Sequence, residues 1–207
     1  MQKKKLAIIN IGIGNIGSVV NCVNKLNFEP VIISNGQELL DYSPSHVLMP
    51  GVGAVREAMN NMKKRNLTDT LEKLVFKEKV FLCGICLGMQ ILSDSSDEFG
   101  FTKCLGWIPG KVSLIKTNGL SIPHMGWNKM IMSKNTDKIF ENIQGKDMYF
   151  AHSYSIKCPD QYIISYTEYA GKIVTAVKLN NIYGIQCHPE KSAAIGRKFI
   201  QNFMSLE

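Results

Sequence analysis

The pentapeptide GICLG at residues 84–88 is the most informative stretch of this sequence. It follows an apolar run at residues 80–83, and residues 89–92 suit a helix. A cysteine between two glycines, where a strand turns into a helix, is the thiol counterpart of the nucleophile elbow, whose glycines permit the sharp turn that displays the central side chain. The N-terminus of the helix would favour the thiolate form of Cys86. The stretch therefore predicts an enzyme with a cysteine nucleophile.

Strand and helix signals alternate on the N-terminal side of this elbow. Strands are expected at residues 6–10, 30–33, 46–49 and 80–83, and helices at 16–26, from about 54, and at 67–77. Such alternation predicts βαβ units, a parallel sheet covered on both faces, and functional groups at the carboxyl ends of its strands.

Short strand signals dominate the chain after about residue 103. They lie at residues 112–115, 148–151, 162–164, 173–177 and 182–185, before a last helix at 193–204. The predicted fold class is therefore α/β, with a mostly parallel central sheet, helices on both faces, and a smaller antiparallel strand-rich part in the C-terminal half. Residues 1–207 are expected to form a single domain.

The composition disfavours membrane and nucleic-acid functions. The chain is 45% hydrophobic and 20% charged, and it has no apolar run near 18 residues, so no membrane span is expected. Its net charge of +7 comes from scattered lysines rather than a basic block interleaved with aromatics, which favours a solvated surface over a nucleic-acid site. The basic N-terminus leads into a strand and does not resemble a signal peptide, so we expect a cytoplasmic protein.

Two short motifs suggest a metal or a cofactor only weakly. The six cysteines include one C-x-x-C at residues 83–86, but no second pair completes a zinc site, and Cys83 falls on a predicted buried strand. The G-x-G-x-x-G at residues 12–17 lacks the carboxylate that a dinucleotide site needs after the second strand. We therefore predict reduced thiols, no metal and no cofactor.

A cysteine nucleophile needs a base, and the base needs an orienting group. His188 follows the strand signal at residues 182–186 and belongs to the tripeptide HPE. Because Pro189 restricts the backbone, His188 and Glu190 can point the same way, with Glu190 on one ring nitrogen. His124 and His152 also lie near strands and remain weaker candidates.

GICLGMQ at residues 84–90, together with HPE at 188–190, closely resembles the class I (triad) glutamine amidotransferases, which have a flavodoxin-like fold. PGVG at 50–53, PHMGWN at 123–128 and GIQCHPEKS at 184–192 narrow the resemblance to the glutaminase subunits of imidazole glycerol phosphate synthase. The resemblance spans almost the whole chain, with several motifs in the same order.

The resemblance implies a site for L-glutamine. Cys86 would attack the side-chain amide, His188 would move protons, and Glu190 would orient His188. The oxyanion would be stabilised by backbone N–H groups of Leu87 and of the turn formed by Gly51, Val52 and Gly53. The residues expected to bind glutamine are Gln90, Glu98, Ser153 and Tyr154.

The resemblance also implies a partner, a (β/α)₈-barrel cyclase that uses the ammonia to make imidazole glycerol phosphate in histidine biosynthesis. Asn15, Met125 and Trp127 are candidate contacts with it, although a turn asparagine and a core tryptophan would explain two of them equally well. Three alternatives stay open: ammonia supply to a synthase that amidinates a bacterial surface sugar, a cysteine peptidase or γ-glutamyl hydrolase, and a docking subunit without catalysis.

Overall fold

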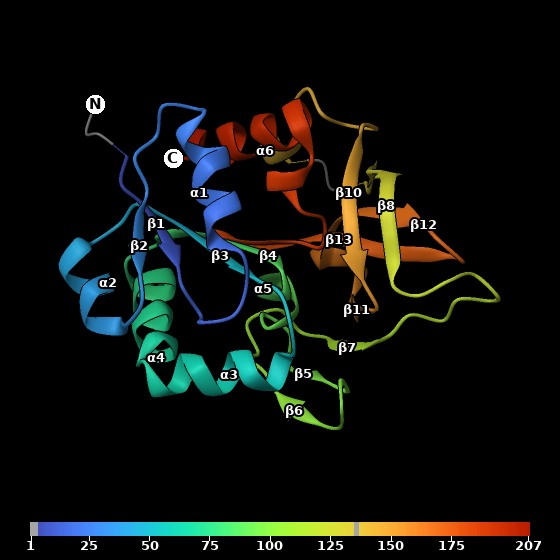
Figure 1. The fold of residues 1–207 in the computed structure, drawn as a ribbon, viewed down its shortest axis with the longest axis horizontal. Coiled ribbons are helices and arrows are strands. Elements are labelled where there is room, and N and C mark those ends of the chain that lie inside the picture. The colour runs from blue at the N-terminus through green and yellow to red at the C-terminus, as the bar shows by residue number, and fades with distance from the viewer. Residues whose placement is uncertain (1–3, 135–136) are drawn as a thin grey trace.

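A computed structural model describes residues 4–134 and 137–207, which form an α/β fold around an eight-stranded sheet (Figure 1). The strand order is β2-β1-β3-β4-β14-β13-β12-β9. The strands from β2 to β14 pair in parallel, and those from β14 to β9 pair antiparallel. Their bounds are Val31–Ile33 (β2), Leu6–Ile9 (β1), His46–Gly51 (β3), Phe81–Cys86 (β4), Ile182–Ile185 (β14), Lys172–Leu179 (β13), Ile163–Glu168 (β12) and Ile131–Met132 (β9). The predicted fold class is confirmed.

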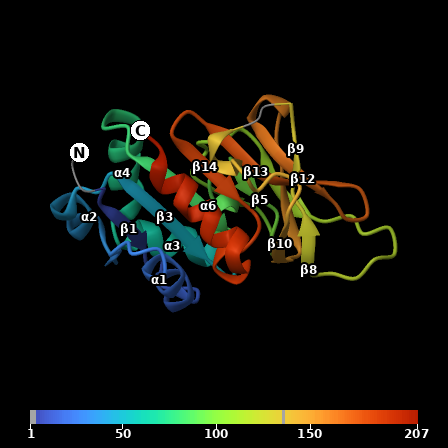
Figure 2. The same cartoon turned by 90° about the horizontal axis from the view of Figure 1, so that it is seen from above.

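Helices cover both faces of this sheet (Figures 1 and 2). One face carries α1 (Ile16–Asn24) and α6 (Ala193–Ser205), and the other carries α2 (Gly36–Tyr42), α3 (Val55–Lys64) and α4 (Leu67–Glu72), which continues as a π-helical turn at Lys73–Lys77. A hydrophobic core lies on each face of the sheet, and successive residues of β1 point into one core and then the other. Leu6 and Ile8 pack on the side of α1 and α6, and Ala7 and Ile9 pack on the opposite side. Among the described residues, no helix is long and apolar enough to cross a membrane.

Two smaller sheets complete the C-terminal half. One pairs β8 (His124–Lys129) with β10 (Asp147–His152), and the other has the order β11-β7-β5-β6. The strands of the second sheet are Tyr154–Lys157 (β11), Lys111–Leu114 (β7), Ser95–Ser96 (β5) and Thr102–Lys103 (β6), and short 3₁₀ turns occupy Lys138–Phe140, Asp160–Tyr162 and Pro189–Lys191. The strand-rich part is as predicted, but α2, β8, β11 and the two-residue strands β5, β6 and β9 were not predicted.

The strand β14 joins the two halves because it lies between β4 and β13. Gly184 pairs with Gly84, and Ile185 with Ile85. A Cβ atom on Gly84 would lie 2.4 Å from the Gly88 carbonyl oxygen, so the glycines let α5 (Leu87–Gln90) pack directly on the strand. The helix α5 begins two residues earlier than predicted and is only four residues long.

Candidate active site

Cys86 lies at the carboxyl end of β4, where the backbone adopts φ +55° and ψ −107°. A positive φ is costly for a residue with a Cβ, and such strain concentrates at functional sites. A Cβ atom on Gly88 would lie 1.8 Å from the Met49 carbonyl oxygen, so only glycine fits two residues after the cysteine. Since α5 has four residues, its aligned peptide dipoles are few, and the predicted help of the helix to a thiolate is small.

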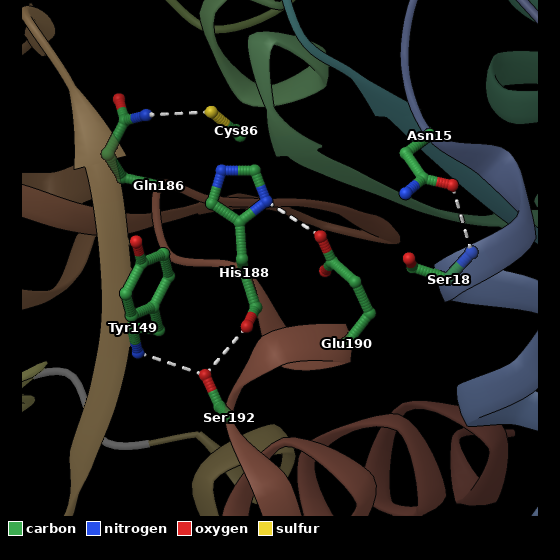
Figure 3. A network of polar contacts seen from close by, with 8 residues as sticks. All are labelled: Asn15, Ser18, Cys86, Tyr149, Gln186, His188, Glu190 and Ser192. Atoms are coloured by element: carbon green, nitrogen blue, oxygen red, sulfur yellow. Dashed lines mark hydrogen bonds and ion pairs between the residues drawn. The ribbon is translucent and has the colours of Figure 1, made fainter. Parts of the chain in front are cut away.

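His188 and Glu190 form a buried pair next to Cys86. Oε1 of Glu190 lies 2.7 Å from Nδ1 of His188, and the two side chains are 7% and 3% exposed. The imidazole lies between the carboxylate and the Cys86 sulfur (Figure 3). Pro189 begins the 3₁₀ turn that carries both side chains, as the HPE motif predicted.

Hydrogen bonds to β10 hold the backbone of this turn in place. The His188 N–H donates to the Tyr149 carbonyl at 2.8 Å, and the Ser192 hydroxyl donates to the His188 carbonyl at 2.6 Å. The Tyr149 N–H in turn donates to the Ser192 hydroxyl (Figure 3). These contacts fix the position of the His188 backbone, from which the imidazole side chain extends.

The charge state of His188 is set by its neighbours. Burial opposes protonation, but the Cys86 sulfur and the Glu190 carboxylate outweigh it and raise the pKa of His188 from 6.5 to about 10. The ring is therefore an imidazolium at neutral pH, placed to stabilise a thiolate on one nitrogen and a carboxylate on the other.

A pocket of about 280 Å³ opens beside Cys86. It is lined by every residue predicted to bind glutamine and by most of the predicted oxyanion residues: Val52, Gly53, Leu87, Gln90, Glu98, Ser153 and Tyr154. Gly51 pairs with Cys86 across β3 and β4, which sets the oxyanion turn beside the nucleophile. The structure thus brings these predicted residues together.

Glu98 and Gln90 are less exposed than ordinary surface residues. Oε2 of Glu98 accepts a hydrogen bond from the Val55 N–H at 2.8 Å, at the start of α3. Gln90 is 6% exposed, and its Nε2 donates to the Tyr154 carbonyl at 3.0 Å. Neither side chain is therefore fully solvated.

Gln186 is a contact of Cys86 that the sequence analysis missed. Its Nε2 donates to the Cys86 sulfur at 3.6 Å (Figure 3), and its Oε1 accepts from Gln90 at 3.2 Å. It follows Ile185 on β14 just as Cys86 follows Ile85 on the adjacent parallel strand. The polar residue directly after an apolar strand was the available signal.

A second, smaller pocket of about 120 Å³ lies on the His188 side of the oxyanion turn, and its lining includes Asn15, Gly51, Val52, His188 and Glu190. Asn15 caps α1, because its Oδ1 accepts from the Ser18 N–H at 3.3 Å. Gly14, at φ +121°, lies so close to the turn that a Cβ atom would be 3.2 Å from the Val52 nitrogen. Val52 lines both pockets, so the oxyanion turn separates them.

Met125 and Trp127 line neither pocket. They are 63% and 51% exposed on β8, and the Trp127 ring meets Tyr149 edge-on at 6.0 Å. The interpretation of Trp127 as a core residue is wrong, and both side chains are free to meet another surface.

The described residues contain no group of three His, Cys, Asp or Glu side chains placed to hold a metal. Cys83, the other half of the C-x-x-C, has no exposed surface on β4, and burial raises the pKa of its thiol. This cysteine is therefore unreactive at neutral pH.

Comparison with known proteins is consistent with this geometry. The family model of class-I glutamine amidotransferases matches residues 7–205. Among the relatives, imidazole glycerol phosphate synthase subunit HisH 2 of Methanococcus maripaludis is 43% identical over 96% of this chain and 98% of its own. HisH 2 of Vibrio vulnificus is 40% identical, covering 97% of this chain and 94% of its own, and HisH of Listeria innocua is 39% identical, covering 96% and 94%.

Solved structures share the fold at lower identity. A crystal structure of a glutamine amidotransferase superimposes with a TM-score of 0.75 at 12% identity, covering 96% of each chain. A chain of PurLQS from Thermotoga maritima gives a TM-score of 0.70 at 19% identity, covering 98% of each.

Proposed function

The chain belongs to the class-I glutamine amidotransferase family, and from this premise we propose that it hydrolyses L-glutamine and supplies the ammonia to imidazole glycerol phosphate synthesis. The observation that carries the proposal is the imidazolium of His188 between Glu190 and Cys86, beside a pocket that contains Gln90 and Glu98. We assign this work to a single unit over residues 1–207, in the cytoplasm, where thiols stay reduced.

The first half of the reaction is attack by the Cys86 thiolate on the carboxamide carbon of glutamine. The negative charge then moves to the amide oxygen, where the N–H groups of Leu87 and of the turn at Gly51–Gly53 can stabilise it. His188 gives its proton to the departing nitrogen as the C–N bond breaks. The products are ammonia and a glutamyl thioester on Cys86.

The second half returns the enzyme to its starting state. His188, now neutral, takes a proton from a water that attacks the thioester. The C–S bond breaks, glutamate leaves, and the thiolate forms again beside the imidazolium. Glu190 keeps the ring oriented and stabilises its charge throughout, as an anionic partner of a catalytic histidine does.

Glu98 suits the α-ammonium group of glutamine. One of its oxygens is already held by the Val55 N–H, which leaves Oε1 for the substrate. Gln90, with Ser153 and Tyr154, would bind the rest of the amino-acid end from the same pocket.

Ammonia must remain unprotonated to serve as a nucleophile, so we propose that it leaves through the second pocket to a (β/α)₈-barrel cyclase. Asn15 at that pocket and the exposed Met125 and Trp127 are the proposed contacts. The names of the three relatives above favour imidazole glycerol phosphate synthesis over the surface-sugar alternative.

The test is to combine the chain with a barrel cyclase and the aminoimidazole-containing ribonucleotide that the cyclase uses. Glutamine-dependent synthesis should be lost in Cys86→Ala, while synthesis from added ammonium salts should persist. Cys104→Ala, which removes a buried thiol away from both pockets, should keep both activities. Loss of ammonium-dependent synthesis in Cys86→Ala, or no stimulation of the wild-type chain by the cyclase and its substrate, would contradict the proposal.

A further inference from the structure

Six polar groups form a continuous hydrogen-bonded path from β8 to the nucleophile. Nδ2 of Asn128 lies 2.8 Å from Nε2 of His124, whose Nδ1 lies 3.0 Å from Nε2 of His152. Nδ1 of His152 lies 2.9 Å from the Tyr154 carbonyl oxygen. Gln90 links that carbonyl to Gln186, and Gln186 donates to Cys86. We call the path the neutral chain; its members are Asn128, His124, His152, the Tyr154 carbonyl, Gln90 and Gln186.

The Tyr154 carbonyl fixes the direction of every bond in its first half. A carbonyl only accepts, so Nδ1 of His152 carries the hydrogen. The Nε2 atom of the neutral His152 ring then accepts, so Nδ1 of His124 must donate, and Nε2 of His124 accepts from the amide of Asn128. Each imidazole therefore has its proton on Nδ1.

The two imidazoles are built to stay uncharged. His124 is 1% exposed, stacked between Phe150 and Tyr169, and burial lowers its pKa from 6.5 to about 4. His152 is 5% exposed, and burial, followed by the nearby His124 and His188, lowers its pKa to about 3. A neutral ring adjacent to the site leaves the charge on His188 without a competing cation.

The amides in the second half are oriented by the same logic. Nε2 of Gln90 donates both to the Tyr154 carbonyl and to Oε1 of Gln186. With Oε1 occupied, Gln186 can present only its NH₂ group to the sulfur, at 3.6 Å. If the Gln186 amide were rotated by 180°, its NH₂ group would face the NH₂ group of Gln90, and neither group could accept a hydrogen bond. Because Gln186 has no exposed surface, water cannot replace the lost bond.

We propose that Gln186 is a further catalytic residue, whose N–H stabilises the Cys86 thiolate, and that His124 and His152 are positioning residues that hold its amide through the Tyr154 carbonyl and Gln90. The proposal rests on the proposed glutaminase function and deepens it. A hydrogen bond to an anion is worth more than one to a neutral group, so the contact favours the thiolate over the thiol. The neutral chain begins at Asn128 on β8, the strand that also carries Met125 and Trp127.

The other titratable groups near the sulfur come from the segment after β14, from β10, and from the loop that carries Glu98. His188 and Glu190 follow β14, Cys187 lies between them and Gln186, and His152 comes from β10. Burial, then Glu190, raises the pKa of Cys187 well above its ordinary value, so it stays a neutral thiol. The charged side chains beside Cys86 are therefore those of His188 and Glu190, with the Glu98 carboxylate in the same pocket.

The test measures alkylation of Cys86 by iodoacetamide in the full chain, followed by peptide mass spectrometry from pH 5 to 10. In Gln186→Leu, we expect the rate at pH 7 to fall about tenfold and the pH midpoint of alkylation to rise by about one unit. Ser165→Ala, which removes a buried hydrogen bond to Thr175 far along the sheet, is the matched control and should alkylate like the wild type. A rate within twofold of wild type in Gln186→Leu, with an unchanged midpoint, overturns the proposal.

The positioning role has its own pair of variants. His152→Asn keeps an N–H where Nδ1 lies, so alkylation should remain within threefold of wild type, whereas His152→Leu should lose about as much as Gln186→Leu. Equal rates in the two His152 variants would overturn this role even if Gln186→Leu failed to fold. The readout needs no glutamine, so it also separates the two proposals: a wild type that releases no glutamate with its cyclase defeats the glutaminase function alone.

Discussion

His188 and His152 are both almost fully buried near Cys86, yet their pKa values are shifted in opposite directions. The pKa of His188 is raised to about 10 and the pKa of His152 is lowered to about 3, from the same ordinary value of 6.5. Their exposed fractions, 3% and 5%, do not explain the difference. The partner does: His188 faces a carboxylate and a sulfur, while His152 faces a carbonyl and another neutral ring. Burial lowers the pKa of both rings, and only His188 has anionic partners that outweigh it.

Glu190→Gln should have the largest effect on this difference between the pKa values of His188 and His152. The amide can still accept from Nδ1, but it lacks the negative charge that stabilises an imidazolium, so the pKa of His188 should fall, with only the Cys86 sulfur left to raise it. We expect kcat for glutamine in the cyclase complex to fall about 10³–10⁴-fold, as when an anionic partner of a catalytic histidine is made neutral. NMR titration of His188 should show a lowered pKa. Glu168→Gln at the exposed end of β12 is the control, and activity of Glu190→Gln within tenfold of wild type would refute the expectation.

The dependence of stability on pH should separate the two kinds of histidine. The pKa values of His124 and His152 are lowered on folding, so their stabilisation is complete above about pH 6.5 and is lost as the pH falls toward 4 and 3. The pKa of His188 is raised, so its contribution is complete below pH 6.5 and is lost as the pH rises through about 10. Each imidazole can change the free energy of unfolding by about 1.4 kcal/mol per pH unit in its window.

Urea unfolding of the wild type and of His152→Asn between pH 4.5 and 7 measures the acid part. The free energy of unfolding of the variant should fall less steeply as the pH is lowered, by up to about 1.4 kcal/mol per pH unit, which is the contribution of one bound proton. Parallel curves for the two proteins would show that His152 is not neutral in the fold.

Trp127→Ala tests whether partner binding and positioning of the nucleophile are separate tasks of β8. The exposed ring should add little to stability, within about 0.5 kcal/mol. Affinity for the cyclase should fall by about 2 kcal/mol, as for a buried aromatic anchor, with the alkylation rate of Cys86 unchanged. Calorimetric titration with the cyclase gives the affinity, and Lys129→Ala at the end of β8 is the control. An unchanged affinity would remove Trp127 from the proposed interface.

Asn15→Ala should have the smallest effect. Asn15 lines the pocket next to His188 and Glu190, but its hydrogen bond is a helix cap, so its loss should cost about 1 kcal/mol of stability. Asn15→Ser keeps a capping oxygen and should recover most of that loss in thermal unfolding. A change in the pKa of His188 in Asn15→Ala would contradict the view that Glu190 and Cys86 alone set its charge.

Much of this structure could be predicted because its information is local. The apolar runs and glycine turns predicted the parallel strands, and the GICLG and HPE motifs predicted which side chains gather at their ends. The helix α2 was predictable too: Asn35 and Glu38 form reciprocal capping bonds, and their spacing is a known start signal.

The neutral chain could not be predicted from the sequence. His124 and His152 meet because β8 and β10 pair in a register that places them opposite each other, and a slip of one residue would turn one of them away. Nothing in the sequence near either histidine specifies that register. The contact of Gln186 with Cys86 likewise depends on β14 pairing with β4, although its place directly after an apolar strand marks it as a candidate.

The insertion of β14 between β4 and β13 has a consequence for how the protein is made. Gln186 follows Cys86 by 100 residues, so the elbow leaves the ribosome well before the groups that activate it. Pairings this distant in sequence form late, because a long loop must close first. A nascent or truncated chain that ends before β14 would carry the Cys86 thiol without its base His188. Such a chain should not hydrolyse glutamine until the last strand is in place.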